Sequence, residues 1–281
     1  MFPLDIWKII FNYLDLTRLV ANSNRKISDV SFMKSLKILY ACSYFYEPCG
    51  INQNGIKELN LITFSANFNN KITNVSFMKS LKKLNISGSS CAVCQSGIKN
   101  LDLIELCVDF NDKITNVSFM KSLKNLSARF NYGMIQNNIK NLNLIELNID
   151  SNANIFDVSF MKSLKILYIE SVFGLDQNGI KGLDLYELYA TYNRKIIYVL
   201  FMKSLKVLHA SDSCGIDQNG IKNLDLVKLD ASYNHKITNV SFMKSLKVLY
   251  IGNGRIDQNG IKKLDLVELV EKKLKHCFNF F

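Results

Sequence analysis

Apolar residues recur along this chain in a fixed frame, LxxLx(A/I/V)xxNxxI, and a second string, SFMKSL, follows that frame almost unchanged each time. The phenylalanine of the second string recurs in steps of 45, 42, 41, 41 and 41 residues, at Phe32, Phe77, Phe119, Phe160, Phe201 and Phe242. A period of this kind is typical of stacked repeat architectures. The pattern therefore predicts one solenoid.

Each 41-residue unit divides into two shorter turns of 19 and 22 residues, which we name the A turn and the B turn. In one B turn the frame reads Leu226, Leu229, Ala231, Asn234 and Ile237. Apolar residues at alternate positions predict a short strand with one face inward, and a coil of about 20 residues is too small to bury that face alone. Because the frame already begins at Leu16, we expect about a dozen coils over residues 16–268.

One asparagine occupies the same position in every B frame. We expect its side-chain amide to bond backbone groups where the chain bends away from the strand, because buried backbone groups without partners are costly. The asparagines of this expected ladder are Asn24, Asn69, Asn111, Asn152, Asn193 and Asn234. The A turns mostly carry other residues at this position, so we expect their corners to be less regular.

The outer part of each coil is expected to differ between the two turns. In the A turn, Asp176, Asp217 and Asp257 precede a polar segment that ends in NGI, and aspartate is a favourable N-cap, so a brief helix is predicted there. In the B turn, the Phe and Met of SFMKSL are expected to fill the outer side of the core.

These residues resemble the leucine-rich repeat family over roughly residues 14–270. The resemblance implies an α/β solenoid, a curved right-handed superhelix with a parallel β-sheet on its concave face and short helical or irregular arcs on its convex face. The A segment is similar to the cysteine-containing repeats common in F-box proteins. The B segment is similar to internalin-type repeats.

Strand positions that face away from the core are free to differ between coils. In the second half of the chain, the residue between the second and third frame positions is Tyr168, Tyr189, His209, Asp230 and Tyr250 in turn. At about 4.8 Å per strand, these five residues would form a stripe roughly 20 Å long on the concave face. Rigid rings with polar ends are typical of interface hot spots, whereas ordinary cross-strand stacking is the alternative. The stripe is our candidate partner-binding surface.

The N-terminal residues 2–15 are similar to the opening helix of an F-box, which docks a substrate receptor onto the Skp1 subunit of a cullin-based ubiquitin ligase. The matching positions include Pro3, Ile6, Ile10, Phe11 and Leu14. The alternative is an amphipathic cap over the first coil, and we favour a cap at residues 1–15. A second capping helix is expected at residues 269–281.

The net charge raises the hypothesis of nucleic-acid binding. Lys and Arg number 35 against 24 Asp and Glu, which gives a net charge of +11. The lysines recur at fixed positions of the coils, and only five of the basic residues are Arg, the side chain best suited to bidentate phosphate and base contacts. A solvated surface is therefore favoured over a nucleic-acid site.

Export, membrane insertion and catalysis are not indicated. Asp5, Lys8 and Asp15 interrupt the only N-terminal apolar stretch, and no apolar run is long enough to span a bilayer. Seven cysteines in such a chain are expected to be reduced thiols of an intracellular, cytoplasmic protein.

Cys91 and Cys94 form one CxxC without further ligands nearby, so we expect no metal or other cofactor. His209 beside Asp230 lacks a nucleophile constellation, so we expect no enzyme.

Taken together, the sequence predicts a non-enzymatic module that binds an unidentified protein on its concave face. The first alternative is an F-box-type substrate-recruiting subunit that binds Skp1. The second alternative is nucleic-acid binding through the lysine columns.

Overall fold

The computed structural model describes residues 15–44, 47–171 and 174–271. The chain divides into two compact units, Met1–Leu142 and Asn143–Phe281, which we call unit 1 and unit 2. The F-box-like or capping helix expected over residues 1–15 lies, except for Asp15, outside the described residues. Most of the C-terminal segment expected to form a cap also lies outside them.

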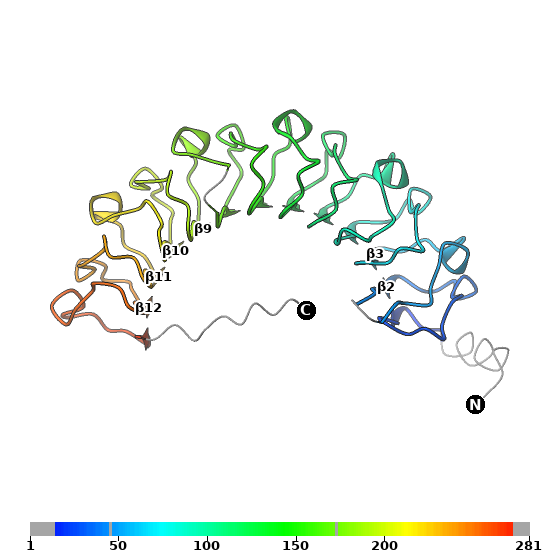
Figure 1. Cartoon of the computed structure of the whole chain (residues 1–281), viewed down its shortest axis with the longest axis horizontal. Coiled ribbons are helices and arrows are strands. Elements are labelled where there is room, and N and C mark those ends of the chain that lie inside the picture. The colour runs from blue at the N-terminus through cyan, green and yellow to red at the C-terminus, as the bar shows by residue number, and fades with distance from the viewer. Residues whose placement is uncertain (1–14, 45–46, 172–173, 272–281) are drawn as a thin grey trace. The chain divides into compact units, whose positions relative to one another are not determined.

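Thirteen strands of three residues each follow one another through the described residues, and inside each unit every strand pairs in parallel with the next one (Figure 1). Unit 1 contains β1 (Arg18–Val20), β2 (Ile38–Tyr40), β3 (Thr63–Ser65), β4 (Lys83–Asn85), β5 (Glu105–Cys107) and β6 (Asn125–Ser127). Unit 2 contains β7 (Glu146–Asn148), β8 (Ile166–Tyr168), β9 (Glu187–Tyr189), β10 (Val207–His209), β11 (Lys228–Asp230), β12 (Val248–Tyr250) and β13 (Glu268–Val270). Within each unit the strands line the inner side and the arcs lie outside. The expected solenoid with a parallel sheet is therefore confirmed.

The strands follow from the alternation of the frame. In β10 the middle residue, Leu208, is fully buried, while Val207 and His209 on either side are partly exposed. Successive side chains of a strand point to opposite faces, so one leucine per strand enters the coil and two residues face outward. Each buried leucine packs in a column with its counterparts in the neighbouring coils, which is how short coils share one core.

The outer side of the B turn is filled by the methionine of SFMKSL and not by its phenylalanine. Met78 is fully buried and Phe77 is 37% exposed, and the other B coils repeat this contrast. The N–H of Met78 donates to the carbonyl of Val75 at 3.0 Å, which closes a tight turn with both apolar side chains inward. Phe77 precedes Met78 in that turn and points outward. The expectation that both residues fill the core was wrong for phenylalanine.

The A arcs contain short 3-10 turns. They are η1 (Asn54–Ile56), η2 (Gln95–Ile98), η3 (Gln136–Asn138), η4 (Asn178–Ile180) and η5 (Asn219–Ile221). The carboxylate of Asp176 accepts the N–H groups of Asn178 and Gly179 at 2.9 Å and 3.1 Å, so the aspartate binds the start of the arc as predicted. A coil this short has room for one tight turn only, and the described B arcs contain no helix.

The asparagine ladder joins B corners to the coil before them. Nδ2 of Asn234 donates to the carbonyls of Ala210 and Ile216 at 2.7 Å and 3.0 Å, and its Oδ1 accepts the N–H of Lys236 at 2.9 Å. Asn69, Asn111 and Asn193 donate to carbonyls in the same way. The side-chain oxygens of Asn24 and Asn152 accept N–H groups two residues further on. The ladder thus satisfies backbone groups that the bend would otherwise leave without partners.

Two A corners are closed by a cysteine, which the sequence did not suggest. Sγ of Cys49 lies 3.3 Å from the carbonyl oxygen of Ala21, and Nζ of Lys71 donates to the carbonyl of Cys49 at 2.9 Å. Cys91 repeats this arrangement with Lys113, whose Nζ donates to its carbonyl at 2.6 Å. The thiol and the lysine each donate to a backbone carbonyl at the A corner, as Nδ2 of the asparagine does at the B corner.

A glutamine clamp and a glycine explain why four of the six A arcs keep the letters QNG, while residues 95–97 read QSG and residues 136–138 read QNN. Oε1 of Gln218 accepts the N–H groups of Thr238 and Asn239 at 3.0 Å and 2.9 Å, and its Nε2 donates to the carbonyl of Asn239 at 2.9 Å. A Cβ atom on Gly220 would lie 2.2 Å from the carbonyl oxygen of Ile197, so only glycine fits at that approach.

The last coil ends the buried core of the described chain. Leu269 in β13 is 38% exposed, whereas its counterpart Leu249 in β12 is fully buried. Strand β13 also shows that the repeats continue past the expected boundary at residue 268. A cap formed by residues 272–281 remains a prediction, because those residues are outside the described part of the chain.

Candidate functional site

The five candidate residues lie side by side on five consecutive strands of unit 2. The register pairs Tyr168 with Tyr189, Tyr189 with His209, His209 with Asp230, and Asp230 with Tyr250. Each is the third residue of its strand, β8 to β12, and therefore points out of the sheet on the face opposite to the buried leucines. We call this set the tyrosine row.

Three members of the tyrosine row form a continuous stack. The ring centroids of Tyr168 and Tyr189 are 4.2 Å apart with an angle of 16° between the ring planes. The imidazole of His209 stacks on the other side, with its centroid 4.5 Å from that of Tyr189 and an angle of 24°. Stacked rings are stabilised beyond their burial, so the alternative of cross-strand packing describes this part of the row correctly.

Carboxylates hold the polar ends of two tyrosines. The hydroxyl of Tyr189 donates to Oε2 of Glu187 at 2.8 Å, and that of Tyr250 donates to Oε1 of Glu268 at 2.8 Å. Burial, followed by the hydrogen bond to Glu187, raises the pKa of Tyr189 well above its usual range. The hydrogen bond to Glu268 raises the pKa of Tyr250. Both phenols are therefore neutral donors at physiological pH.

His209 and Asp230 face each other, with Nδ1 of His209 3.7 Å from Oδ2 of Asp230. Burial by itself would raise the pKa of Asp230, but His209 and the hydrogen bonds from Ser232 outweigh it, and the pKa is lowered. Nε2 of His209 is buried and has no hydrogen-bond partner among the described residues.

A second aromatic pair, which the sequence analysis did not single out, lies in unit 1. The rings of Phe110 and Phe130 are stacked with centroids 4.7 Å apart. Both residues have positive φ angles, 59° and 50°, which bulky side chains rarely adopt. The available signal was their position directly before Asn111 and Asn131, where the chain leaves the strand.

Several lysines of the expected columns donate to backbone carbonyls of the solenoid itself. Nζ of Lys79 donates to the carbonyl of Ser76 at 2.7 Å, and Lys121 and Lys244 repeat this contact in their own coils. Lys34 forms an ion pair with Glu58 at 2.9 Å. These contacts support the solvated-surface interpretation of the lysine columns over a phosphate-binding one.

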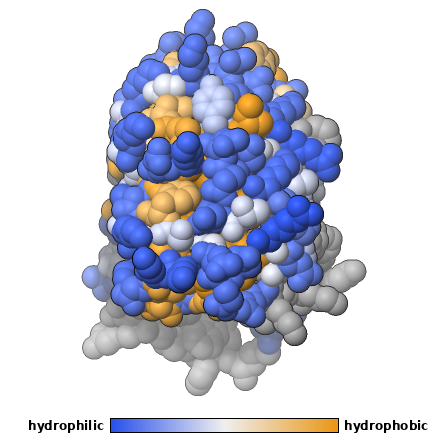
Figure 2. Space-filling model, turned by 90° about the vertical axis from the view of Figure 1, so that its left-hand side faces the viewer, coloured by the Kyte–Doolittle hydropathy of each residue, from blue (hydrophilic) through white to orange (hydrophobic). Residues whose placement is uncertain are grey.

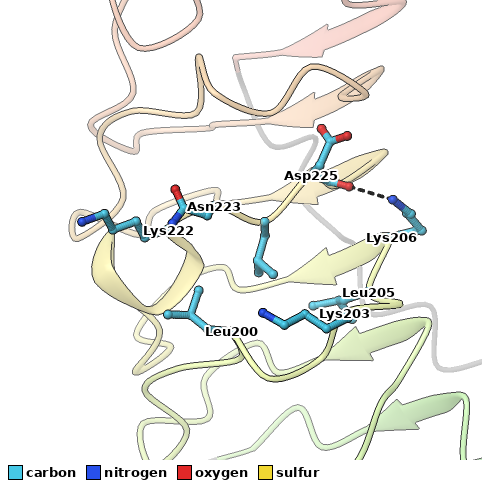
Figure 3. A pocket seen from close by; sticks show the side chains of 8 residues that line it. Leu200, Lys203, Leu205, Lys206, Lys222, Asn223 and Asp225 are labelled. Carbon is cyan, nitrogen blue, oxygen red and sulfur yellow. Dashed lines mark hydrogen bonds between the residues drawn. The ribbon is translucent and has the colours of Figure 1, made fainter.

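A cavity of about 270 Å³ in unit 2 is lined by the end of one B turn, the A turn that follows and the start of the next B turn (Figure 3). Its lining consists of Leu200, Lys203, Leu205, Lys206, Lys222, Asn223, Leu224 and Asp225. Nζ of Lys206 donates to the carbonyl of Asp225 at 3.1 Å, and the side chain of Lys222 points away from the other two lysines. Because the ammonium groups do not converge, the cavity is not organised to hold an anion.

The surface at the C-terminal end of unit 2 is mixed. Figure 2 shows this side of the molecule, where hydrophobic residues form separate patches between hydrophilic ones. Val227 and Val267, which immediately precede strand residues of β11 and β13, are 38% and 81% exposed.

Among the described residues, no group of three or more His, Cys, Asp or Glu side chains could hold a metal ion. In the same part of the chain, no helix has the length and apolarity needed to cross a bilayer.

Comparison of the sequence with protein-family models and with curated proteins gives no match. Solved structures do resemble the fold. An internalin from Listeria monocytogenes aligns with a TM-score of 0.58 and 15% sequence identity, covering 92% of this chain and 88% of the internalin. TLR13, in its complex with ssRNA13, aligns with a TM-score of 0.52 and 18% identity, covering 86% of this chain and 40% of TLR13.

At this level of identity the likeness concerns the fold alone. The described coils form a leucine-rich repeat solenoid, as the sequence predicted. No comparison supports the F-box resemblance of residues 2–15.

Proposed function

We propose that this protein is a non-enzymatic protein-binding module and that its partner contacts the tyrosine row on the concave face of unit 2. The observation that carries this proposal is the set of Tyr168, Tyr189, His209, Asp230 and Tyr250 on consecutive strands, with rings stacked at 4.2 Å and 4.5 Å. The frame of the solenoid does not require rings there, because the same strand position in unit 1 holds Ser65 and Ser127 as well as Tyr40. Pre-ordered aromatic side chains lose little conformational entropy on binding, which suits them to anchor a partner.

The test compares two tyrosines of the same coil. Tyr189→Ala removes the central ring of the three-ring stack, whereas Tyr186→Ala removes a tyrosine that is 48% exposed but precedes the strand and lies outside the row. Proteins captured by the unmodified chain are identified, and their binding to both purified variants is then measured. We expect at least a tenfold weaker affinity for Tyr189→Ala, as is typical of hot-spot truncation, and unchanged affinity for Tyr186→Ala. Circular dichroism checks that both variants remain folded. Equal binding by both folded variants would refute the proposal.

The adaptor alternative rests on residues 2–15 and predicts a different partner. Deleting residues 1–15 should abolish recovery of Skp1 and a cullin if the N-terminal segment acts as an F-box. Absence of Skp1 from captures made with the intact chain would leave the general binding module. Nucleic-acid binding through the lysine columns predicts affinity for single-stranded RNA or DNA that falls steeply with added salt.

A further inference from the structure

The strand face of unit 2 has the opposite charge to the chain as a whole. The outward positions are the first and third residues of β7 to β13, and four of them are acidic, namely Glu146, Glu187, Asp230 and Glu268. Lys228 is the one Lys or Arg among those positions in these described strands, so the balance is 1 − 4 = −3 with neutral histidine. The full chain, by contrast, carries +11. A negative face on a positive protein concentrates cations locally.

The acidic residues are regularly spaced. They lie on β7, β9, β11 and β13, which are the strands of the B turns, so one carboxylate recurs on every second strand. At about 4.8 Å between strands, neighbouring carboxylates are separated by roughly 10 Å along the sheet. The equivalent outward positions of β1 to β6 hold Arg18, Lys83 and Glu105 as their charged residues, so unit 1 lacks this row of acids.

The rings between these carboxylates are suited to cations as well. A ring attracts a cation to its face, and a phenol that donates its proton to a carboxylate is richer in electrons than a free phenol. Tyr189 and Tyr250 both donate in this way. One ammonium group of the protein itself already uses the surface, because Nζ of Lys228 lies 5.5 Å from the centroid of the Tyr250 ring.

The electrostatics around Tyr168 agree with this picture. Burial raises the pKa of this phenol, and the carboxylates of Glu146 and Glu187 raise it further. Glu170 acts in the same direction. Three carboxylates thus act on one ring of the stack.

Resting on the proposed function, we infer that the partner presents a basic segment, with lysine or arginine side chains about 10 Å apart, to the tyrosine row of unit 2. Each cationic group would lie near the carboxylate of a B strand. Those at the two ends of the row would also face a ring, that of Tyr168 or Tyr250, whereas both faces of Tyr189 are covered by Tyr168 and His209. A guanidinium is favoured over an ammonium, because it stacks on aromatic faces and bonds carboxylates through two N–H groups.

The test uses the full chain and three fluorescent peptides of glycine and serine. Every third residue is replaced by arginine in the first peptide, by glutamine in the second and by glutamate in the third. We expect the arginine peptide to bind most tightly and its affinity to fall with added salt. Glu187→Gln and Glu268→Gln should each weaken the affinity for the arginine peptide about two- to fivefold, the range of single exposed cation contacts. Lys228→Gln should strengthen it by a similar factor, because a competing cation is removed.

Glu105→Gln is the matched control, because Glu105 occupies the same strand position in β5 of unit 1. It should leave the affinity of the arginine peptide unchanged. Equal or tighter binding of the glutamate peptide would overturn the inference. So would equal losses in Glu187→Gln and Glu105→Gln.

A displayed library of random peptides separates this inference from the proposed function. Binders that require Tyr189 but carry no excess of lysine or arginine would overturn the basic-segment inference and leave the tyrosine row as the binding surface. Binders that tolerate both Tyr189→Ala and Tyr250→Ala would overturn the proposed function itself. Basic binders that are lost with Tyr189→Ala would support both.

Discussion

The imidazole of His209 stacks on the ring of Tyr189, with 4.5 Å between their centroids, while its Nδ1 faces the carboxylate of Asp230 at 3.7 Å. One side chain therefore links the aromatic part of the row to its acidic part. A double-mutant cycle on Tyr189→Ala and His209→Ala should give a coupling free energy of unfolding of about 0.5–1.5 kcal/mol, the range for stacked pairs. Urea denaturation of the four chains measures it. Strictly additive losses would show that the two rings are adjacent without stabilising each other.

Loss of one ladder asparagine should destabilise the solenoid. Asn234→Ala leaves the carbonyls of Ala210 and Ile216 buried without their donor, which should lower the free energy of unfolding by about 2–4 kcal/mol. Urea denaturation followed by circular dichroism measures this. Asn253→Ala is the control, because Asn253 is exposed. The urea midpoint of this variant should differ little from that of the unmodified chain. Similar shifts in both variants would contradict the ladder's role.

Substitution by alanine should destabilise the chain at two glycine positions, for different reasons. In Gly220→Ala the new methyl group would lie 2.2 Å from the backbone oxygen of Ile197, and we expect a loss of about 2–3 kcal/mol in the free energy of unfolding. At Gly182 a new methyl group would make only an ordinary contact, 3.5 Å from Nζ of Lys162, but φ is +72°, so Gly182→Ala should cost only about 1 kcal/mol. Thermal unfolding ranks the two variants. A larger loss for Gly182→Ala would mean that backbone conformation outweighs the close approach.

Lowering the pH should reduce the free energy of unfolding of the solenoid, partly because three aspartates become protonated. Hydrogen bonds from Ser122, Ser204 and Ser245 lower the pKa values of Asp102, Asp184 and Asp225, respectively. Because each folded-state pKa lies below the unfolded value of about 3.9, the stabilisation is complete above that pH and is lost as the pH falls through the folded-state value.

Replacing all three aspartates by asparagine tests this. The chain already uses asparagine at this position, where Oδ1 of Asn60 accepts the N–H of Ser80 at 2.9 Å and its Nδ2 donates to the hydroxyl at 2.8 Å. The triple variant should keep the urea midpoint of the unmodified chain at neutral pH and lose less stability between about pH 5 and pH 3. An unchanged decline in acid would rule out these carboxylates as its source.

Thiol reactivity should differ sharply between cysteines. The hydrogen bond with Ser96 lowers the pKa of the partly exposed Cys94, whereas burial raises the pKa of Cys91 and Cys214 to about 11. The thiolate is the nucleophile, so iodoacetamide at mildly alkaline pH should modify Cys94 long before the other two. Mass spectrometry of timed samples measures the order. Unfolding in urea should equalise the rates, and equal rates in the native chain would contradict the burial of Cys91 and Cys214.

The frame of the solenoid was predictable because stacking requires the same residue type in every coil. Leu208 and Asn234 occupy positions of that kind, and counting along the chain identified them. The direction of Phe77 was not predictable, because it depends on the turn that joins Val75 to Met78 and not on hydrophobicity. The clamp made by Gln218 was also missed, since its partners lie 20 and 21 residues later and a polar side chain in an arc suggests solvent.

The candidate site was only partly visible in the sequence. The repeats align Tyr168, Tyr189 and His209 on consecutive strands, but they do not say that the rings lie face to face. The repeats also place the column of Glu187 and Glu268 on the strand side, together with Asp230. The sequence does not show that the carboxylates of Glu187 and Glu268 accept the hydroxyls of Tyr189 and Tyr250, because that depends on side-chain conformation.

The ladder bonds that close the coils reach only the adjacent coil, as those of Asn234 and Gln218 show. A gene that duplicated or lost one complete pair of A and B turns would therefore encode a chain in which every remaining corner still finds its partner. Evolution can lengthen or shorten such a protein in whole steps.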